Sequence, residues 1–267
     1  MGELGLARYW HIYAACVRNC LAREFEFRGA FVLKAVSGML WAGITILLTV
    51  FIFGNVREMR GWTLDRMMVL TGTFLLVQYT SSALFRQNMI RLSELVNKGE
   101  LDFVLIRPIS SQFLVSTRYV DFTDVPGILV GVVYLAEGLR RAEAQVSLVQ
   151  VAQYAALFIC ALVSGYSVWF AMVTASLWTG RLNNVSHGMT PISNLARIPV
   201  EAYRGLVYVL LAFVLPVGVA ATFPAQALLG TLAPGMLPYQ VLASLAMLAA
   251  AHWFWRVSLR RYSSASS

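Results

Sequence analysis

Six stretches of the sequence are dominated by apolar residues and are separated by shorter polar intervals. An α-helix needs roughly 20 apolar residues to cross a bilayer, and most of these stretches reach that length. They cover residues 31–53, 64–85, 113–139, 146–178, 206–219 (the beginning of the fifth) and 237–257. The pattern predicts an all-α polytopic membrane protein whose six transmembrane helices form one domain over residues 31–257.

The composition supports a membrane protein and argues against a soluble one. Only 13% of the residues are charged and 58% are hydrophobic, whereas a soluble domain has roughly 25% charged residues. The net charge is +8, but the basic residues fall at the ends of the apolar stretches. Such positions are typical of residues that set topology and contact anionic lipid headgroups. We therefore expect membrane lipids, and no nucleic acid, among the partners.

The N-terminal segment is amphipathic rather than continuously apolar. Over residues 6–23, Trp10 and Tyr13 recur with other apolar residues at helical spacing, while Arg8 and Arg18 lie on the other side. A helix with one aromatic face and one basic face is suited to the plane of the lipid headgroups. We predict an interfacial helix on the cytoplasmic side within residues 1–30; the alternative is a helix in a soluble core.

Basic residues are distributed unequally between the two sides that six spans would define. The segments on the side of the termini carry sixteen Lys and Arg residues, and those on the other side carry five. Because positive residues concentrate on the cytoplasmic side, both termini are predicted to be cytoplasmic. The same side would hold the loop at 86–118, a second loop at 181–204 and a tail at 258–267.

The interval before the last span is apolar but contains four prolines, at positions 216, 224, 234 and 238. Each proline removes a backbone donor and so argues against one continuous helix. Irregular backbone at membrane depth is stable only where protein buries it or where it lines a cavity. We predict a re-entrant pair of half-helices that dips back from the outer face over residues 220–236. An ordinary apolar outer loop is the alternative.

No signature of a catalytic, nucleotide-binding or metal site occurs in the sequence. The phosphate-binding G-x-x-x-x-G-K-[ST], the zinc-binding H-E-x-x-H and the nucleophile motif G-x-S-x-G are all absent. His11, His187 and His252 fall in different predicted segments. Cys16 and Cys20 have no further soft ligands near them in the sequence. We therefore expect no cofactor on this chain and no enzymatic activity.

Two acids stand near the start of the third predicted span. Asp121 and Asp124 are three residues apart and would share one helix face. Ionisable residues inside a span are functional candidates, and this pair would suit a proton relay. In the first turn of a helix, however, acids also interact favourably with the helix dipole, and Arg118 is close by in the sequence. We favour the structural role.

Gly127 and Gly131 form a G-x-x-x-G pair in the same span. Small residues at this spacing allow two lipid-embedded helices to approach closely. The pair predicts that the third span is a contact helix, without naming its partner.

The longest polar interval between two apolar stretches runs from Arg86 to Arg118. Apolar residues recur at helical spacing in its first part and predict a short amphipathic helix, which Gly99 is placed to end in a left-handed cap. Residues 100–106 form a second apolar turn, and Arg107 is biased to extended backbone by Pro108. A compact, capped element on a cytoplasmic loop is suited to docking a partner; the alternative is a plain interfacial connector.

Two stretches of the chain resemble a known family. The run Lys98-Gly99-Glu100-Leu101-Asp102, followed by Leu105-Ile106-Arg107-Pro108, is similar to the linker of the permease subunits of ABC-2 type transporters. The similarity is to the bacterial branch in which a short permease accompanies a separate ATPase. Residues 210–230 resemble the fifth span and re-entrant region of that branch. The layout of helices agrees over almost the whole chain.

The resemblance implies a type V exporter-like fold in the bacterial plasma (inner) membrane. Two permeases, the same or related chains, would pair, and two copies of an ABC ATPase subunit carrying ATP and Mg would bind beneath them. A second, smaller contact with the ATPase is implied at residues 183–199. The residues implied in ATPase coupling are Leu95, Lys98, Gly99, Glu100, Leu101, Asp102, Arg107 and Pro108. Neither the substrate nor the residues that line its pathway follow from the resemblance.

Three functions are compatible with the sequence. The resemblance favours the permease subunit of an ATP-driven ABC exporter, which forms half of the translocation pathway. An autonomous carrier or channel, proton-coupled through Asp121 and Asp124, is the alternative. A membrane-embedded enzyme ranks last because the sequence contains no catalytic motif.

Overall fold

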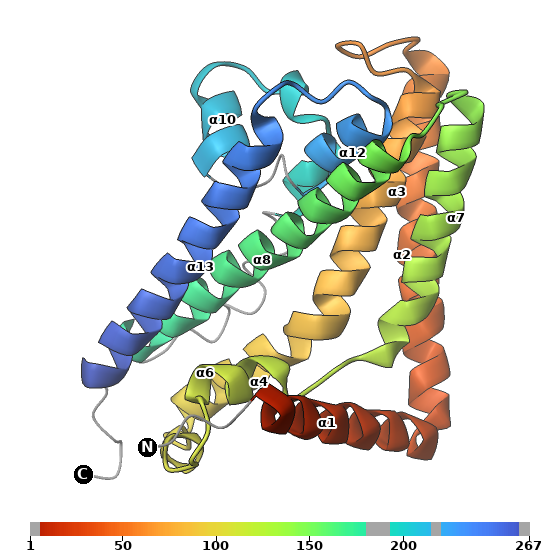
Figure 1. The fold of residues 1–267 in the computed structure, drawn as a ribbon. Coiled ribbons are helices and arrows are strands. Elements are labelled where there is room, and N and C mark those ends of the chain that lie inside the picture. The colour runs from red at the N-terminus through yellow and green to blue at the C-terminus, as the bar shows by residue number, and fades with distance from the viewer. Residues whose placement is uncertain (1–5, 180–192, 215–219, 262–267) are drawn as a thin grey trace.

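The computed structural model describes residues 6–179, 193–214 and 220–261, and every regular element among them is a helix (Figure 1). The long helices are α1 (Leu6–Glu26), α2 (Arg28–Asn55), α3 (Leu64–Ser81), α4 (Gln87–Asn97), α7 (Val125–Arg141), α8 (Leu148–Thr179) and α13 (Met236–Arg261). The short ones are η1 (Ser82–Arg86), α5 (Asp102–Leu105), α6 (Ser111–Thr117), η2 (Phe122–Asp124), η3 (Leu195–Arg197), η4 (Val200–Ala202), α10 (Gly205–Val209), η5 (Leu210–Val214) and α12 (Thr222–Leu228).

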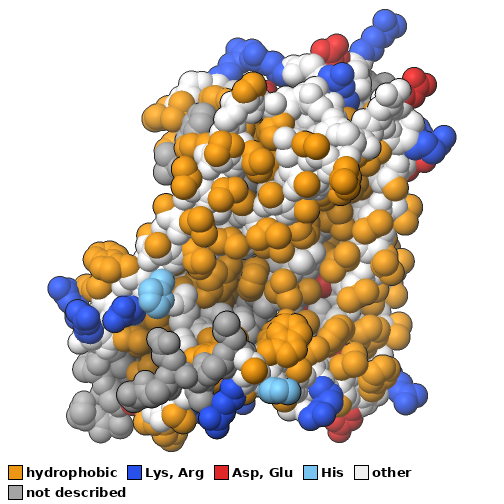
Figure 2. Space-filling model, in the orientation of Figure 1, with side chains coloured by type: hydrophobic (Ala, Val, Ile, Leu, Met, Phe, Trp, Pro, Cys, Tyr) orange, Lys and Arg blue, Asp and Glu red, His pale blue; other side chains and the backbone are white. Residues whose placement is uncertain are grey.

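Five helical stretches in the described part of the chain are long and apolar enough to cross a membrane. They are Arg28–Asn55, Leu64–Asn97, Phe122–Arg141, Leu148–Trp178 and Met236–Arg261. In Figure 2, hydrophobic side chains cover the middle of the molecule, and charged side chains gather mainly at its two ends. The prediction of an all-α, multi-pass membrane protein is confirmed.

α3 is the central helix of the bundle and lies against α2, α7 and α8. In the span that begins with α3, 72% of the most apolar part is buried inside the protein. The corresponding share is 22% in each of the spans formed by α2, α7 and α13. A π-helical turn, η1, joins α3 to α4 without a break. The second span, predicted over residues 64–85, therefore continues as helix to Asn97.

The third span begins at Phe122 rather than at Phe113, because polar residues interrupt the helix. Residues 111–117 form α6 instead, at the end of the bundle that carries α1. The Asn88 side chain donates to the carbonyl oxygen of Tyr119 at 2.7 Å and accepts from its N–H at 2.9 Å. Asp121 then caps η2 by accepting from the N–H of Thr123 at 3.0 Å. These bonds of the Asn88 and Asp121 side chains replace the backbone hydrogen bonds that a continuous helix would form here.

The predicted fifth span is not one continuous α-helix within the described residues. α10 and η5 have five residues each, which together extend about 15 Å, or half of a bilayer core of roughly 30 Å. Residues 215–219 lie outside the described part. α8 ends beside the C-terminal end of α13, at the α1 end of the bundle, and α13 begins at the opposite end (Figure 1). The chain between them therefore crosses once more.

Part of this crossing is made by residues 193–204, which we predicted in a cytoplasmic loop at 181–204. η3 lies against α3, and the N–H of Val200 donates to the hydroxyl of Thr222 in α12 at 3.1 Å. Asn and Pro in this stretch suggested an exposed loop, but irregular backbone is equally stable when protein surrounds it. Residues 181–192 lie outside the described part of the chain.

The predicted re-entrant pair over residues 220–236 is represented by one short helix and a turn. α12 is almost entirely buried, with Phe223 and Ala225 in the main hydrophobic core. Gly230 and Gly235 then adopt positive φ angles of 68° and 82°, which favour glycine. They turn the chain into α13, so the second half-helix is absent from the described residues 220–236. α13 extends to Arg261, into the predicted tail; residues 262–267 are not described.

α1 lies across one end of the bundle, and the spans run away from it (Figure 1). Trp10 and Phe25 are exposed on its surface. Tyr9 faces the bundle: its ring meets that of Phe113 in α6 edge-on, with the centroids 4.8 Å apart, and its hydroxyl accepts from the N–H of Ser110. This is the orientation that a helix in the headgroup plane requires.

α3 and α7 approach closely because glycine stands where they cross. A Cβ atom at Gly127 would lie 2.5 Å from the ring of Tyr79, and one at Gly131 would lie 3.1 Å from Leu76. Contacts below 3 Å are too short for real atoms, so a larger residue at 127 would force the helices apart. α3 is thus the helix that packs against the Gly127 and Gly131 face of α7.

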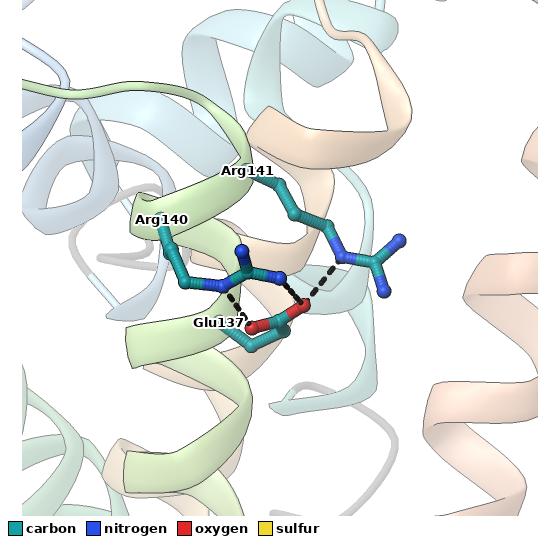
Figure 3. A network of polar contacts seen from close by, with 3 residues as sticks. All are labelled: Glu137, Arg140 and Arg141. Carbon is teal, nitrogen blue, oxygen red and sulfur yellow. Dashed lines mark hydrogen bonds and ion pairs between the residues drawn. The ribbon is translucent and has the colours of Figure 1, made fainter.

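A cluster of charges marks the end of α7 that is farthest from α1. Figure 3 shows Glu137 between Arg140 and Arg141. The carboxylate accepts from Nε and Nη2 of Arg140, both at 2.7 Å, and from Nε of Arg141 at 2.6 Å. All three side chains are exposed or half-exposed, so the cluster adds little stability. Three charged side chains at this end of the helix suit a position at the membrane surface rather than in the lipid interior.

Replacing Gly72 of α3 by alanine should destabilise the protein. The new methyl group would lie 2.6 Å from the backbone nitrogen of Leu135 in α7, and backbone cannot move aside as a side chain can. Overpacking of this kind costs roughly 1–3 kcal/mol. Gly43→Ala in α2 is the control, because no atom lies within 4 Å of its new methyl group. Thermal unfolding of the purified chain in detergent measures both; equal melting temperatures would contradict the close α3–α7 contact.

Candidate functional site

The loop at residues 86–118 folds into a compact element of α4, α5 and α6 at the α1 end of the bundle (Figure 1). Gly99 ends α4 as predicted, with a φ angle of 70°. Its N–H donates to the carbonyl oxygen of Val96 at 3.2 Å, and that of Glu100 donates to Leu95 at 2.9 Å. These two bonds form a Schellman motif. The motif fixes the direction in which the chain leaves α4 and enters α5.

α5 has one face inside the protein and one face outside. Leu101, just before the helix, and Val104 are fully or almost fully buried. Phe103 and Ile106 point the other way and are 68% and 77% exposed. We call the pair Phe103 and Ile106 the docking tip. Exposed apolar side chains of this size on a small, well-anchored element are typical of a site that binds another protein.

The predicted coupling residues divide according to these two faces. Lys98, Glu100, Arg107 and Pro108 are exposed; Leu95, Gly99 and Asp102 are partly buried; Leu101 is buried. Leu101 therefore anchors the element rather than touching a partner. The candidate residues named from the sequence do not include Phe103 and Ile106, because residues 100–106 were interpreted as a single apolar turn. Their spacing of three residues, offset from Leu101 and Val104, was the available signal.

A second hydrophobic core joins the element to two of the spans. It contains Leu101 and Val104 of the α5 region, Leu92 of α4, Phe170 of α8 and Trp255 of α13, among others. The rings of Phe170 and Trp255 lie 5.2 Å apart. This core is separate from the main one, which surrounds α3. A displacement of α5 would therefore be passed directly to α8 and α13, because packed cores transmit strain.

Hydrogen bonds reinforce the same connection. The hydroxyl of Tyr166 in α8 lies 2.7 Å from Ser116 Oγ and accepts from Gln112 Nε2 at 3.2 Å, both in α6. Gln112 Oε1 lies 2.5 Å from Nδ1 of His252 in α13. The indole of Trp255 donates to Ser111 at 3.3 Å. α6 is thus bonded to both spans, and His252 has a partner that the sequence did not reveal.

Asp121 and Asp124 do not share the face of one α-helix. Asp121 precedes η2 and accepts from both the N–H and the hydroxyl of Thr123, and its own N–H donates to the carbonyl oxygen of Ala83 at 2.9 Å. Asp124 ends η2 at the start of α7. Asp121 therefore has a capping role that accounts for its position.

The comparison with protein families gives one match. The model of the ABC-2 family transporter protein matches residues 39–266, which include every candidate span except the first part of α2, and the whole element made of α4, α5 and α6. The chain belongs to the ABC-2 transporter family. Neither the comparison with curated proteins nor the comparison with solved structures finds a match.

Family membership confirms that the chain is a membrane transport component, the permease of an ABC-2 type transporter. The element made of α4, α5 and α6 lies at the α1 end of the bundle, where α4 continues the second candidate span. In the described part of the chain, no group of three or more His, Cys, Asp or Glu side chains could hold a metal ion.

Tyr166→Phe should weaken the link between α6 and α8. It removes one hydroxyl and keeps the ring, so Ser116 and Gln112 lose a partner in a mostly buried site. Leaving buried polar groups unpaired costs roughly 1–3 kcal/mol. Tyr134→Phe is the matched control, because the hydroxyl of Tyr134 is buried without a partner. Thermal unfolding should show a lower melting temperature for the first variant alone; the reverse order would contradict the network.

Proposed function

We propose that this ABC-2 permease is one subunit of an ATP-driven exporter. Two permeases, identical or related, pair in the bacterial plasma membrane with both termini in the cytoplasm. Two copies of a separate ABC ATPase subunit bind ATP and Mg, and they dock on the element made of α4, α5 and α6. The permease contributes half of the translocation pathway, and the ATPase supplies the energy.

The docking tip is the observation that carries this proposal. Phe103 and Ile106 are both more than two-thirds exposed, while the element that presents them is held by a Schellman motif and by a buried core. Exposed Lys98 and Arg107 flank them in the sequence. An apolar centre with polar surroundings is the usual composition of a protein-binding site. The chain has no phosphate-binding motif of its own, which agrees with nucleotide chemistry on a partner.

The contacts behind the docking tip support a mechanical role. Closure of an ATPase dimer would push or turn α5, and the core formed with Phe170 and Trp255 would pass this movement to α8 and α13. Both helices are candidate membrane spans. A change of access to a pathway between two permeases then follows from a rigid-body movement of these helices.

Co-purification tests the proposal directly. The tagged full chain, extracted from its native membrane in mild detergent, should retain a P-loop ATPase subunit that mass spectrometry identifies, and the complex should hydrolyse ATP. A purified chain that drives uphill transport in liposomes with no ATPase present would contradict the proposal.

Replacing Phe103 and Ile106 together by alanine should release the ATPase. Truncating apolar anchors at the centre of an interface costs well over 1 kcal/mol, so affinity should fall roughly tenfold or more. Both side chains are exposed, so the melting temperature of the permease alone should not change. The control is Leu148→Ala with Val149→Ala, an equally exposed pair at the start of α8. Equal retention of the ATPase by both double variants would exclude the docking tip.

A further inference from the structure

Arg197 is a cation inside the membrane part of the protein. It ends η3 in the segment that crosses between α8 and α13. Its guanidinium carbon lies 5.1 Å from the ring centre of Trp41 in α2 and 5.6 Å from that of Phe74 in α3. Both rings belong to the central parts of their spans. Cation–π contacts within about 6 Å stabilise such a charge, but they do not satisfy its N–H groups.

Arg197 has no acidic partner among the residues that the structure describes. In the described part of the chain, no carboxylate lies within ion-pairing distance of Arg197. The stretches next to it that are not described, residues 180–192 and 215–219, contain no Asp or Glu. Nε and Nη2 of Arg197 are buried and have no hydrogen-bond partner. Ionisable residues at membrane depth are costly and mark substrate or ion sites by default.

A cavity of about 760 Å³ lies beside Arg197, between α2, α3, α8 and the crossing segment. Its walls include the two rings that Arg197 contacts and its neighbours Asn194 and Ala196. Trp169 of α8 also lines the cavity, and its buried indole N–H has no hydrogen-bond partner. The volume is within the range of small-molecule sites, roughly 300–1,000 Å³.

The remaining charges of the cavity balance one another. Lys34 and Arg86 line it together with Asp121 and Asp124, two cations and two acids at its α1 end. Arg197, near the middle of the spans, therefore leaves one unbalanced positive charge beside the cavity. The positive charge of Arg197, next to the cavity wall, favours an anionic ligand, and the aromatic walls favour one with an apolar body.

We propose that this cavity binds an amphiphilic anion, with its apolar body against Trp41, Phe74 and Trp169 and its charged group attracted by Arg197, which lies against the Trp41 and Phe74 rings of the cavity wall. The inference rests on the proposed transport function and names the class of substrate. The irregular crossing segment makes the site possible, because it places Arg197 between two spans. On the outer surface of a spanning helix, an arginine at the same depth would be exposed to lipid.

Two fluorescent probes with the same ring system test the site. Anilinonaphthalene sulfonate is anionic, and phenylnaphthylamine lacks the sulfonate. Energy transfer from tryptophan to the probe reports binding to the full chain in phosphatidylcholine nanodiscs, after subtraction of empty nanodiscs. Arg197→Gln should weaken binding of the sulfonate roughly tenfold or more, because the positive charge next to the cavity wall is lost. Binding of phenylnaphthylamine should stay within about twofold of the unmodified chain, since it depends on the apolar walls.

Two further variants keep the test specific. Arg197→Lys retains the charge and should recover part of the sulfonate affinity. Arg204→Gln removes an exposed arginine seven positions later and should change neither probe. The site is excluded if the unmodified chain does not bind the sulfonate above the nanodisc background, or if Arg197→Gln and Arg204→Gln bind it equally well.

A change of lipid distinguishes two sources of the anion, an anionic bilayer lipid and a non-lipid amphiphile. In nanodiscs made of equal parts phosphatidylcholine and phosphatidylglycerol, weaker sulfonate binding would show that an anionic bilayer lipid occupies the cavity; unchanged binding would show that the site selects a non-lipid amphiphile. These measurements need no ATPase. Sulfonate binding can be absent while the ATPase still docks, and it can be present when the ATPase does not dock. The two proposals are therefore tested separately.

Discussion

The backbone contact between α3 and α7 is the constraint on which the other parts of this permease depend. In lipid there is no hydrophobic gain when apolar helices associate, so close packing decides which helices pair. Gly72 on one helix and Gly127 on the other remove the side chains that would separate them. α3 is thereby fixed at the centre of the bundle, and it continues through η1 into α4. The element made of α4, α5 and α6 therefore continues from the most buried of the five candidate spans in the described part of the chain.

The same helix passes from one hydrophobic core to another. The upper part, α3, belongs to the main core, and Met89 and Leu92 of α4 belong to the core that contains the α5 anchors. η1 lies between them, and π-helical turns are frequent at functional sites because their hydrogen bonds are easily rearranged. α8 also contributes to both cores, through Leu157 and Phe170. The two cores are thus connected through η1 and through the middle of α8.

Much of this arrangement could be predicted from the sequence, where a local signal was strong. Hydropathy located the spans, and Gly99 after an amphipathic run predicted the cap that the structure shows. The start of α7 could not be predicted, because it depends on Asn88, more than thirty residues away, bonding the backbone of Tyr119. The exposure of Phe103 depends on how α5 packs against α6, with Leu101 and Val104 in the second core, which no local pattern records.

Arg197 shows most clearly why composition misleads in a membrane protein. A basic residue among Asn, Ser and Pro is read as part of a cytoplasmic loop, and it counted toward the orientation of the chain. The structure places it between Trp41 and Phe74 instead, and it places the exposed Arg204 next to α10, at the end opposite α1. The predicted orientation does not depend on either residue, since the excess of positive charge lies in α1, in the element made of α4, α5 and α6, and at the end of α13. What changes is the meaning of the charge at position 197. A residue in a loop reports topology, whereas an unpaired cation beside a cavity within the spans requires a partner, and the described part of the chain supplies none.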